Sequence, residues 1–188
     1  MLRNAFIAAA LMSVVLISAG LAIAATVRAA DLESLIDRSD YVIYGRVLWH
    51  HPIWDEATRT IWTVTELQVL DGPKGRIGSV VRVTEPGGVL GDIGHMFPGV
   101  PKFRTNQEVV LFLYHAPGNR IRVTGIQQGV YLVMTNGATR DRLAQPLVPL
   151  REAVYEAGRG HSVQPRQQTG QQRLDDLLFA IRQRAIKR

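Results

Sequence analysis

The fold of this chain is decided by two stretches, YVIYGRVLWH at residues 41–50 and TIWTVTELQVL at residues 60–70. Both are rich in β-branched and aromatic residues, which favour strands. Successive residues of a strand point to opposite faces. In the second stretch Ile61 and Leu67 therefore share one face and Trp62 takes the other. The two stretches predict the strands of a first hairpin.

Four further stretches have the composition of strands, at residues 80–84, 109–115, 120–124 and 129–135. Turn residues separate the strands. Pro52 is expected to end the first one, and the dipeptide Asn136-Gly137 favours a tight turn after the last. Six short strands with turns between them and no interleaved helices predict an all-β fold, an antiparallel barrel or a sandwich.

Apolar residues at helical spacing flank the predicted strands on both sides. Residues 31–37 predict a short N-terminal helix, because Leu32, Leu35 and Ile36 recur at helical intervals and acidic residues lie in the first turn. A C-terminal amphipathic helix with a basic outer face is predicted from the apolar stripe Leu174, Leu177, Leu178 and Ile181.

The first 30 residues have the order of a secretory signal peptide. Arg3 supplies a positive charge, residues 5–23 are almost entirely apolar, and small residues follow. Cleavage is predicted after Ala24 or after Ala29, which makes the protein exported, either periplasmic or secreted. The apolar run is also long enough to cross a bilayer, so an uncleaved membrane anchor is the alternative.

The net charge of +6 is spread unevenly over the predicted parts of the chain. The signal peptide, residues 1–30, precedes a β-barrel domain at residues 31–140 and a C-terminal extension at residues 141–188, made of a linker and the basic helix. Residues 31–150 carry twelve basic and twelve acidic side chains, whereas residues 151–188 carry eight and four. A neutral body indicates no nucleic-acid partner. The basic helix fits a peripheral contact with an anionic surface.

The composition narrows the chemistry that the chain can perform. It contains no cysteine, which excludes a disulfide-stapled scaffold, a thiolate nucleophile and a cysteine-ligated zinc site. No serine stands in a Gly-x-Ser-x-Gly pattern. His50 and His51 are adjacent on a predicted strand, so their side chains point to opposite faces and do not share a metal ion. The sequence assigns no catalytic residue, no metal site and no cofactor.

Three stretches resemble a known family pattern. The family is the netrin-like domain of the tissue inhibitors of metalloproteinases. Its first strand is similar to SDYVIYGRVLW (residues 39–49), and its second strand is similar to IWTVTELQVLDGPKG (residues 61–75). Its later strands are similar to VVLFLYHAPGNRIRVTGIQQG (residues 109–129). The same pattern appears in uncharacterised exported bacterial proteins, which this chain resembles more closely still. The resemblance implies an OB-like barrel. The inhibitors bind the protease zinc through an N-terminal cysteine, which this chain lacks, so the resemblance leaves the function open.

A long Gly/Pro-rich loop at residues 85–101 is the first candidate for a binding site. Loops of this length in compact domains are often functional. The loop offers carboxylate, imidazole and aromatic side chains, at Glu85, Asp92, His95 and Phe97. In the alternative interpretation its apolar residues plug the end of the barrel: Val89, Leu90, Met96 and Phe97.

A second candidate is aromatic. Trp49, Trp54 and Trp62 fall on or beside the first predicted hairpin, where they can form a platform for a sugar or a peptide. Burial in a corner of the barrel is the alternative explanation.

These observations favour an exported, non-catalytic module that binds a protein or glycan in the cell envelope. The netrin-like resemblance adds an association with proteases as one form that this binding can take. Two alternatives stay open. One is an exported hydrolase that uses Glu85, Asp92 or His95, and the other is a structural envelope protein held by the basic helix.

Overall fold

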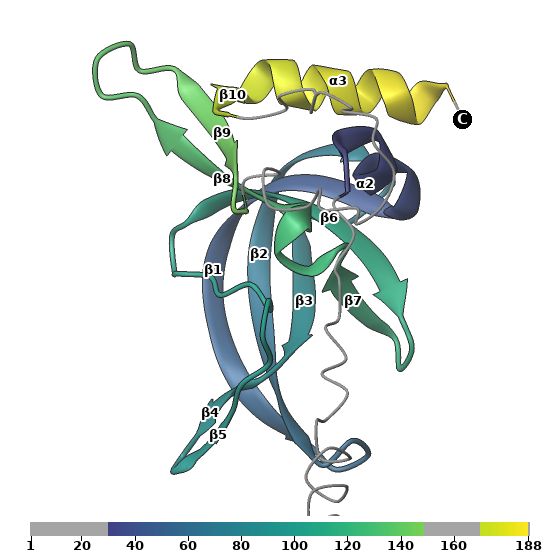
Figure 1. The fold of residues 1–188 in the computed structure, drawn as a ribbon, viewed down its shortest axis with the longest axis vertical. Coiled ribbons are helices and arrows are strands. Elements are labelled where there is room, and N and C mark those ends of the chain that lie inside the picture. The colour runs from purple at the N-terminus through teal and green to yellow at the C-terminus, as the bar shows by residue number, and fades with distance from the viewer. Residues whose placement is uncertain (1–29, 149–169, 188) are drawn as a thin grey trace, which may run out of the picture.

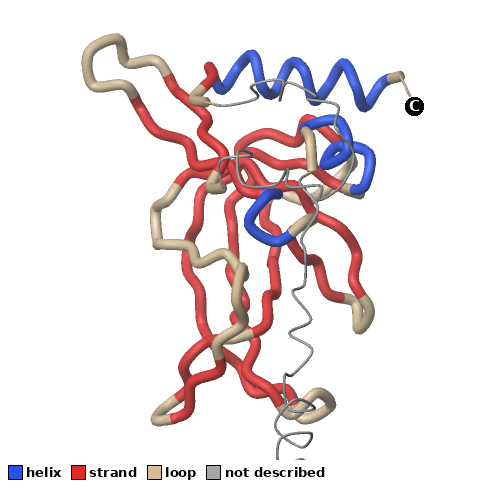
Figure 2. Tube along the Cα trace, viewed as in Figure 1, coloured by secondary structure: helices blue, strands red, loops and turns tan. Residues whose placement is uncertain are grey.

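The computed structural model describes residues 30–148 and 170–187, which are mostly β-structure (Figures 1 and 2). The strands are β1 Tyr41–Asp55, β2 Thr60–Lys74, β3 Val80–Pro86, β4 Gly88–Leu90, β5 Ile93–His95, β6 Glu108–Ala116, β7 Arg120–Val123, β8 Val130–Thr135, β9 Arg142–Pro146 and β10 Gln172–Arg173. The helices are α2 Leu32–Arg38, the short 3-10 helix η1 Ile126–Gly129 and α3 Leu174–Ile186. The predicted β-rich class, the short N-terminal helix and the C-terminal helix are confirmed.

Eight of the described strands form one large sheet in the order β1-β2-β3-β7-β6-β8-β9-β10, and β1 also pairs with β6. The pairings thus return to β1 by way of β3, β7 and β6. The step from β3 to β7 is parallel and rests on one residue pair, Val83 with Ile121. The sheet is therefore strongly curved but is not a clear closed barrel. Strands β4 and β5 form a separate two-stranded sheet.

The first hairpin is longer than the sequence predicts. Strand β1 continues through Pro52 to Asp55, so the expectation that Pro52 ends the strand is wrong. Strand β6 pairs with β1 only over residues 41–46. Pro52 consequently lies where β1 has a single partner among the described strands, and a proline is tolerated there because one edge needs no ladder hydrogen bond.

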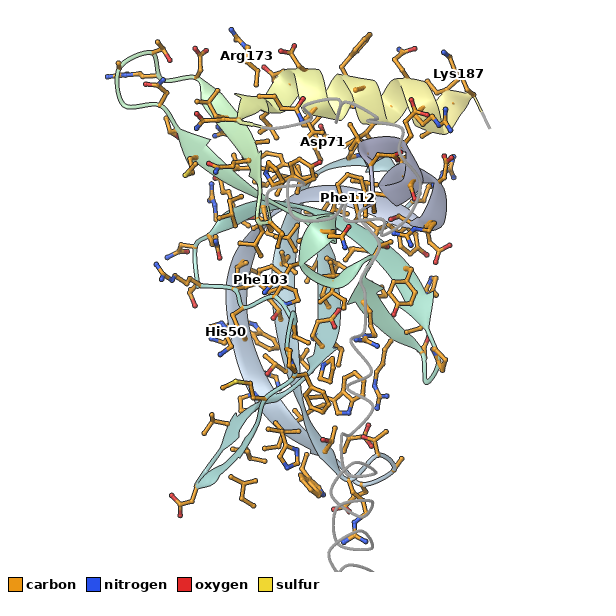
Figure 3. All side chains as sticks on the ribbon, viewed as in Figure 1. His50, Asp71, Phe103, Phe112, Arg173 and Lys187 are labelled. Atoms are coloured by element: carbon orange, nitrogen blue, oxygen red, sulfur yellow. The ribbon has the colours of Figure 1, made fainter. Side chains whose placement is uncertain are left out.

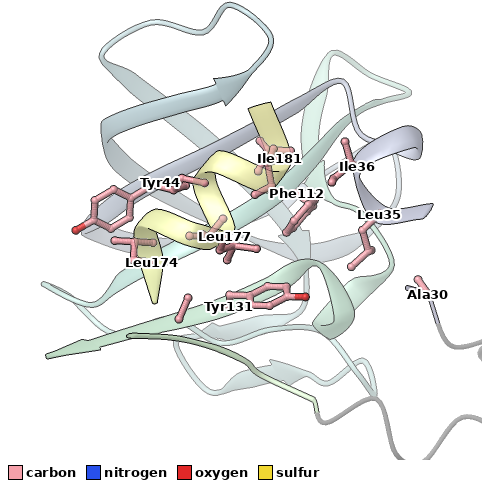
Figure 4. Packing of buried hydrophobic residues seen from close by; sticks show 13 residues of the cluster. Ala30, Leu35, Ile36, Tyr44, Phe112, Tyr131, Leu174, Leu177 and Ile181 are labelled. Atoms are coloured by element: carbon pink, nitrogen blue, oxygen red, sulfur yellow. The ribbon is translucent and has the colours of Figure 1, made fainter. Parts of the chain in front are cut away.

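Two apolar clusters lie on opposite faces of the sheet, and β6 contributes to both. Its side chains at Val109, Leu111 and Leu113 enter the cluster on the concave face, and those at Val110 and Phe112 enter the cluster beneath the helices. A strand buried on both faces reads as a continuous apolar run, as VVLFL does. Figure 4 shows the second cluster, in which the predicted stripe of α3 is buried: Leu174, Leu177, Leu178 and Ile181.

Arginines on the outer part of α3 pair with carboxylates of the same chain. Arg184 contacts Asp37 at 2.8 Å and Glu33 at 3.1 Å, and Arg182 pairs with Asp71 on β2. These contacts fasten α3 to α2 and to the first hairpin; a contact with an anionic surface stays a prediction. Within residues 30–148 and 170–187, no helix is long and apolar enough to span a membrane.

Candidate functional site

A cavity of about 570 Å³ lies between the first three strands and the chain that follows β3. Its floor is the concave face of the sheet, with His50 and Pro52 from β1 and Thr63 and Thr65 from β2. Residues 86–89, 94–97 and 100–103 form its other walls. In Figure 3 His50 and Phe103, which both line the cavity, appear along the middle of the long hairpin.

The strand register brings the floor residues together. His50 pairs with Thr65, and Pro52 pairs with Thr63, which in turn pairs with Glu85 of β3. Residues in register on one face of a sheet have neighbouring side chains. On the concave face, the part nearer the helices carries apolar side chains, and the part that lines the cavity carries the hydroxyl groups of Thr63 and Thr65 and the imidazole of His50. The cavity is the polar continuation of the apolar cluster on this face.

Part of the predicted loop is an ordered hairpin, β4–β5, that packs directly on β2. The Gly87 N–H donates to the Ile61 carbonyl at 2.7 Å, and the Thr63 hydroxyl donates to the Gly87 carbonyl at 2.6 Å. Gly88 has φ +139°, and a Cβ atom there would lie 2.6 Å from the Thr63 hydroxyl oxygen. Only glycine allows this approach, which explains the Gly87-Gly88 pair that begins the hairpin.

His95 fixes the second strand of this hairpin to β2. Its Nδ1 accepts a hydrogen bond from the Ile61 N–H at 3.2 Å and lies 2.8 Å from the Thr60 hydroxyl oxygen. Because a backbone N–H can only donate, Nδ1 is the unprotonated nitrogen, which places the ring proton on Nε2. His95 thus positions β5 at the edge of the cavity.

Glu85 joins β3 to β7 at the weakest step of the large sheet. Its carboxylate accepts hydrogen bonds from the Val123 N–H at 2.6 Å and from the Arg122 guanidinium at 2.9 Å. Burial raises the pKa of Glu85, and the bonds from Val123 and Arg122 only partly oppose this effect. Glu85 lies at the cavity wall, but its carboxylate is used to close the seam between β3 and β7.

The other loop candidates are divided between the cavity and the hairpin tip. Phe97 lines the cavity, whereas Asp92 lies in the exposed turn between β4 and β5 and is not among the lining residues. The alternative in which apolar loop residues plug a barrel end is not supported: Val89 is 68% exposed and Met96 is 83% exposed.

The three tryptophans do not form one platform. Trp62 is buried under the Arg120 guanidinium, 4.2 Å from the ring centre, and donates its Nε1–H to Thr58. Trp49 stacks on His51 with ring centres 4.6 Å apart. Trp54 is 40% exposed and pairs across the hairpin with Ile61, on the face opposite Trp62.

Large apolar side chains are exposed at the end of the molecule formed by β4–β5 and the far part of β1. We name this set the apolar end; it consists of Ile53, Trp54, Val89, Leu90, Ile93, Met96 and Phe97. Trp54 and His95 connect its two parts, with ring centres 6.0 Å apart. Figure 1 shows β4–β5 and the β1–β2 turn at the end opposite α2 and α3.

Sequence reasoning missed several lining residues, chiefly Thr65, Lys102 and Phe103. A signal was present in Thr63 and Thr65, two polar residues at positions that continue the inward-facing row of Leu67.

Comparison of the chain with protein-family models, with curated proteins and with solved structures finds no match.

Proposed function

We propose that this protein is an exported, non-catalytic module that binds a partner protein through the cavity and the apolar end. The observation that carries the proposal is the exposure of large apolar side chains around an open cavity, on a hairpin tied to the sheet by hydrogen bonds. Exposed apolar patches of this kind mark interaction surfaces.

The carboxylate and imidazole groups that a hydrolase could use are already hydrogen-bonded within the protein, which favours binding over hydrolysis. Glu85 is held by Arg122 and Val123, and Nδ1 of His95 is held by the backbone of β2. A general base must be able to reach a proton of the substrate. Asp92, the third candidate for a hydrolase, lies at the hairpin tip and outside the cavity lining.

The kind of exposed side chain favours a protein over a glycan. Sugar rings stack on exposed aromatic faces, and here the face of Trp62 is covered by Arg120 while Trp49 stacks on His51. The apolar end presents chiefly non-aromatic side chains: Val89, Ile93 and Met96 are 57–83% exposed, more than its two aromatic residues, Trp54 at 40% and Phe97 at 41%. Burial of aliphatic surface is a driving force for protein association.

The proposal includes an OB-like barrel related to netrin-like domains and a cleaved signal peptide. The ring of strand pairings from β1 through β2, β3, β7 and β6 back to β1 supports the barrel. The charged, apolar and small segments of residues 1–30 support export.

Affinity capture from an envelope fraction tests the proposal. The immobilised protein is compared with the double variant Val89→Ser/Met96→Ser and with a matched control, Phe179→Ser/Ile186→Ser. The control residues are 62% and 78% exposed on α3, at the other end of the molecule. A partner protein should be lost with the first variant and retained with the second. Equal retention by both would contradict the proposal, and retention of a polysaccharide instead would favour the glycan alternative.

A further inference from the structure

We infer that the cavity receives a segment of the partner protein in which an apolar side chain is adjacent to an Asp or Glu carboxylate. This inference rests on the proposed function and adds the chemistry that the site selects. It is carried by the combination of apolar walls with hydrogen-bond donors and one cationic side chain, Lys102, that have no hydrogen-bond or ion-pair partner in the described part of the chain.

The apolar half of the site is formed by the walls of the cavity. Phe97 and Phe103 lie on the loop side, and Pro52 lies on the strand side. Phe103 is 9% exposed and belongs to the apolar cluster of the concave face, so the cavity ends against packed core atoms. A volume of about 570 Å³ is ample for one or two apolar side chains of a partner.

The polar half of the site consists of Thr65, His50 and Lys102. Thr65 is 4% exposed, and no hydrogen bond of its hydroxyl is found among residues 30–148 and 170–187. His50, its cross-strand neighbour, and Lys102 also line the cavity, and neither makes an ion pair within the described residues. A hydroxyl, an imidazole and an ammonium can all donate hydrogen bonds.

The balance of charge determines which ligand fits. Glu85 is the single acidic residue among the described residues that line the cavity, and its carboxylate already accepts bonds from Arg122 and Val123. Thr65, His50 and Lys102 therefore face the cavity, and the Glu85 carboxylate does not accept their hydrogen bonds. A carboxylate next to an apolar group complements this arrangement, whereas a cationic group would meet Lys102.

A pair of fluorescent probes tests this selectivity directly. 8-Anilinonaphthalene-1-sulfonate has an apolar ring system and one anionic group, and N-phenyl-1-naphthylamine has the same rings without the sulfonate. The purified full chain is titrated with each probe. Three variants remove the polar groups one at a time, His50→Gln, Lys102→Gln and Thr65→Val. Arg104→Gln is the matched control, because it removes a neighbouring charge that does not line the cavity.

We expect each of the three variants to weaken binding of the anionic probe by about two- to fivefold, and the double variant His50→Gln/Lys102→Gln by up to about tenfold, as for partly exposed charge contacts. Binding of the uncharged probe should stay within about twofold, as should binding of both probes to Arg104→Gln. A peptide amide with adjacent Leu and Glu should displace the anionic probe better than the same peptide with Gln.

The inference is overturned if Arg104→Gln weakens anionic binding as much as Lys102→Gln does, if both probes lose affinity equally, or if the Glu and Gln peptides compete equally. Failure of the proposed function has a different signature. If capture depends on Val89 and Met96 but the probes show no charge selectivity, the proposed function stands and the inference fails. If the probes are selective but capture ignores both residues, the proposed function fails.

Discussion

The long hairpin of β1 and β2 connects two regions of the molecule, the end covered by α2 and α3 and the apolar end. The two regions differ in how far their apolar side chains are buried. At the helix-covered end, Val42 and Tyr44 lie beneath α2 and α3 and are at most 5% exposed. At the apolar end, large apolar side chains are 37–83% exposed, from Ile53 to Met96. The comparison indicates that one region maintains the fold while the other is free to present apolar surface to a partner.

The first way to test this contrast is to truncate one phenylalanine in each region. Phe112 is fully buried beneath the helices, so Phe112→Ala should lower the free energy of unfolding by about 3–5 kcal/mol, because it leaves a cavity in a packed core. Phe97 is 41% exposed, and Phe97→Ala should cost less than about 1 kcal/mol. Urea denaturation measures both. Similar losses would show that the apolar end is also a structural core.

The second test concerns the seam between β3 and β7. Glu85→Gln should destabilise the protein by roughly 1–3 kcal/mol at neutral pH, because the amide replaces one acceptor oxygen with a donor, so that one of the buried bonds from Val123 and Arg122 is lost. Glu66→Gln is the control on the same sheet. Its partner Arg82 has a 70% exposed side chain, so its loss should cost at most about 1 kcal/mol. Equal effects would mean that the Glu85 carboxylate is not needed to close the seam.

The pH dependence sharpens this comparison through a second glutamate, Glu108. Burial acts to raise the pKa of Glu108, but hydrogen bonds from Tyr44 and Arg46 and the charge of Arg142 outweigh it and hold that pKa below 4.5. For Glu85 burial prevails, so its pKa lies above 4.5.

The two glutamates should therefore give opposite slopes of stability against pH. A carboxyl group whose pKa is raised in the folded state, as for Glu85, stabilises the fold below pH 4.5, and this contribution is lost as the pH rises through the folded pKa. A carboxyl group whose pKa is lowered in the folded state, as for Glu108, stabilises the fold above pH 4.5, and this contribution is lost as the pH falls through the folded pKa. As the pH rises from about 4 to about 7, the stability of the native protein relative to Glu85→Gln should fall; as it rises from about 3 to about 5, the stability relative to Glu108→Gln should rise. Slopes of the same sign would contradict the two environments.

An effect no larger than that of Glu85→Gln is expected within the β4–β5 hairpin. Gly88→Ala places a Cβ atom 2.6 Å from the Thr63 hydroxyl oxygen at φ +139°, and should cost about 1–3 kcal/mol. Gly91→Ala, at φ +59° with nothing within 4 Å, should cost about 1 kcal/mol. Amide hydrogen exchange at Gly87 should accelerate in the first variant only. Acceleration in neither would mean that the hairpin does not depend on this close approach.

The smallest change in stability is expected at the most exposed residue of the apolar end. Met96 is 83% exposed, so Met96→Ser should shift the free energy of unfolding by less than about 0.5 kcal/mol. Thermal unfolding followed by circular dichroism measures it, with Ile186→Ser as the matched control on α3. A loss above about 2 kcal/mol would place Met96 in a packed contact, and the contrast between the two regions would then fail.

The strand core could be predicted because each stretch carries its own pattern. Alternation along 60–70 and the apolar run at 109–113 place the strands, and the spacing of Leu174 and Leu177 places α3. Strands β4 and β5 could not be predicted in this way. They are three residues long and Gly-rich, and they form where β2 offers hydrogen-bond partners from a distant part of the chain.

The candidate site shows the same division. The sequence singled out the segment that walls the cavity, because its length and its glycines are local properties. It could not distinguish the roles within that segment. Glu85 bonds to an N–H group 38 residues away, and Thr65 becomes a cavity residue only through the register with His50.

The sequence by itself determined the β-rich class, the positions of the main strands and the two helices that flank them, because hydrophobic periodicity and turn residues act over a few neighbours. Only the tertiary structure decided that β1 continues through Pro52, that Glu85 closes a seam, and that a cavity opens between Thr65 and Phe103. These features depend on which strands become neighbours and which edges stay unpaired. They arise from burial and hydrogen bonding between segments that are far apart along the chain.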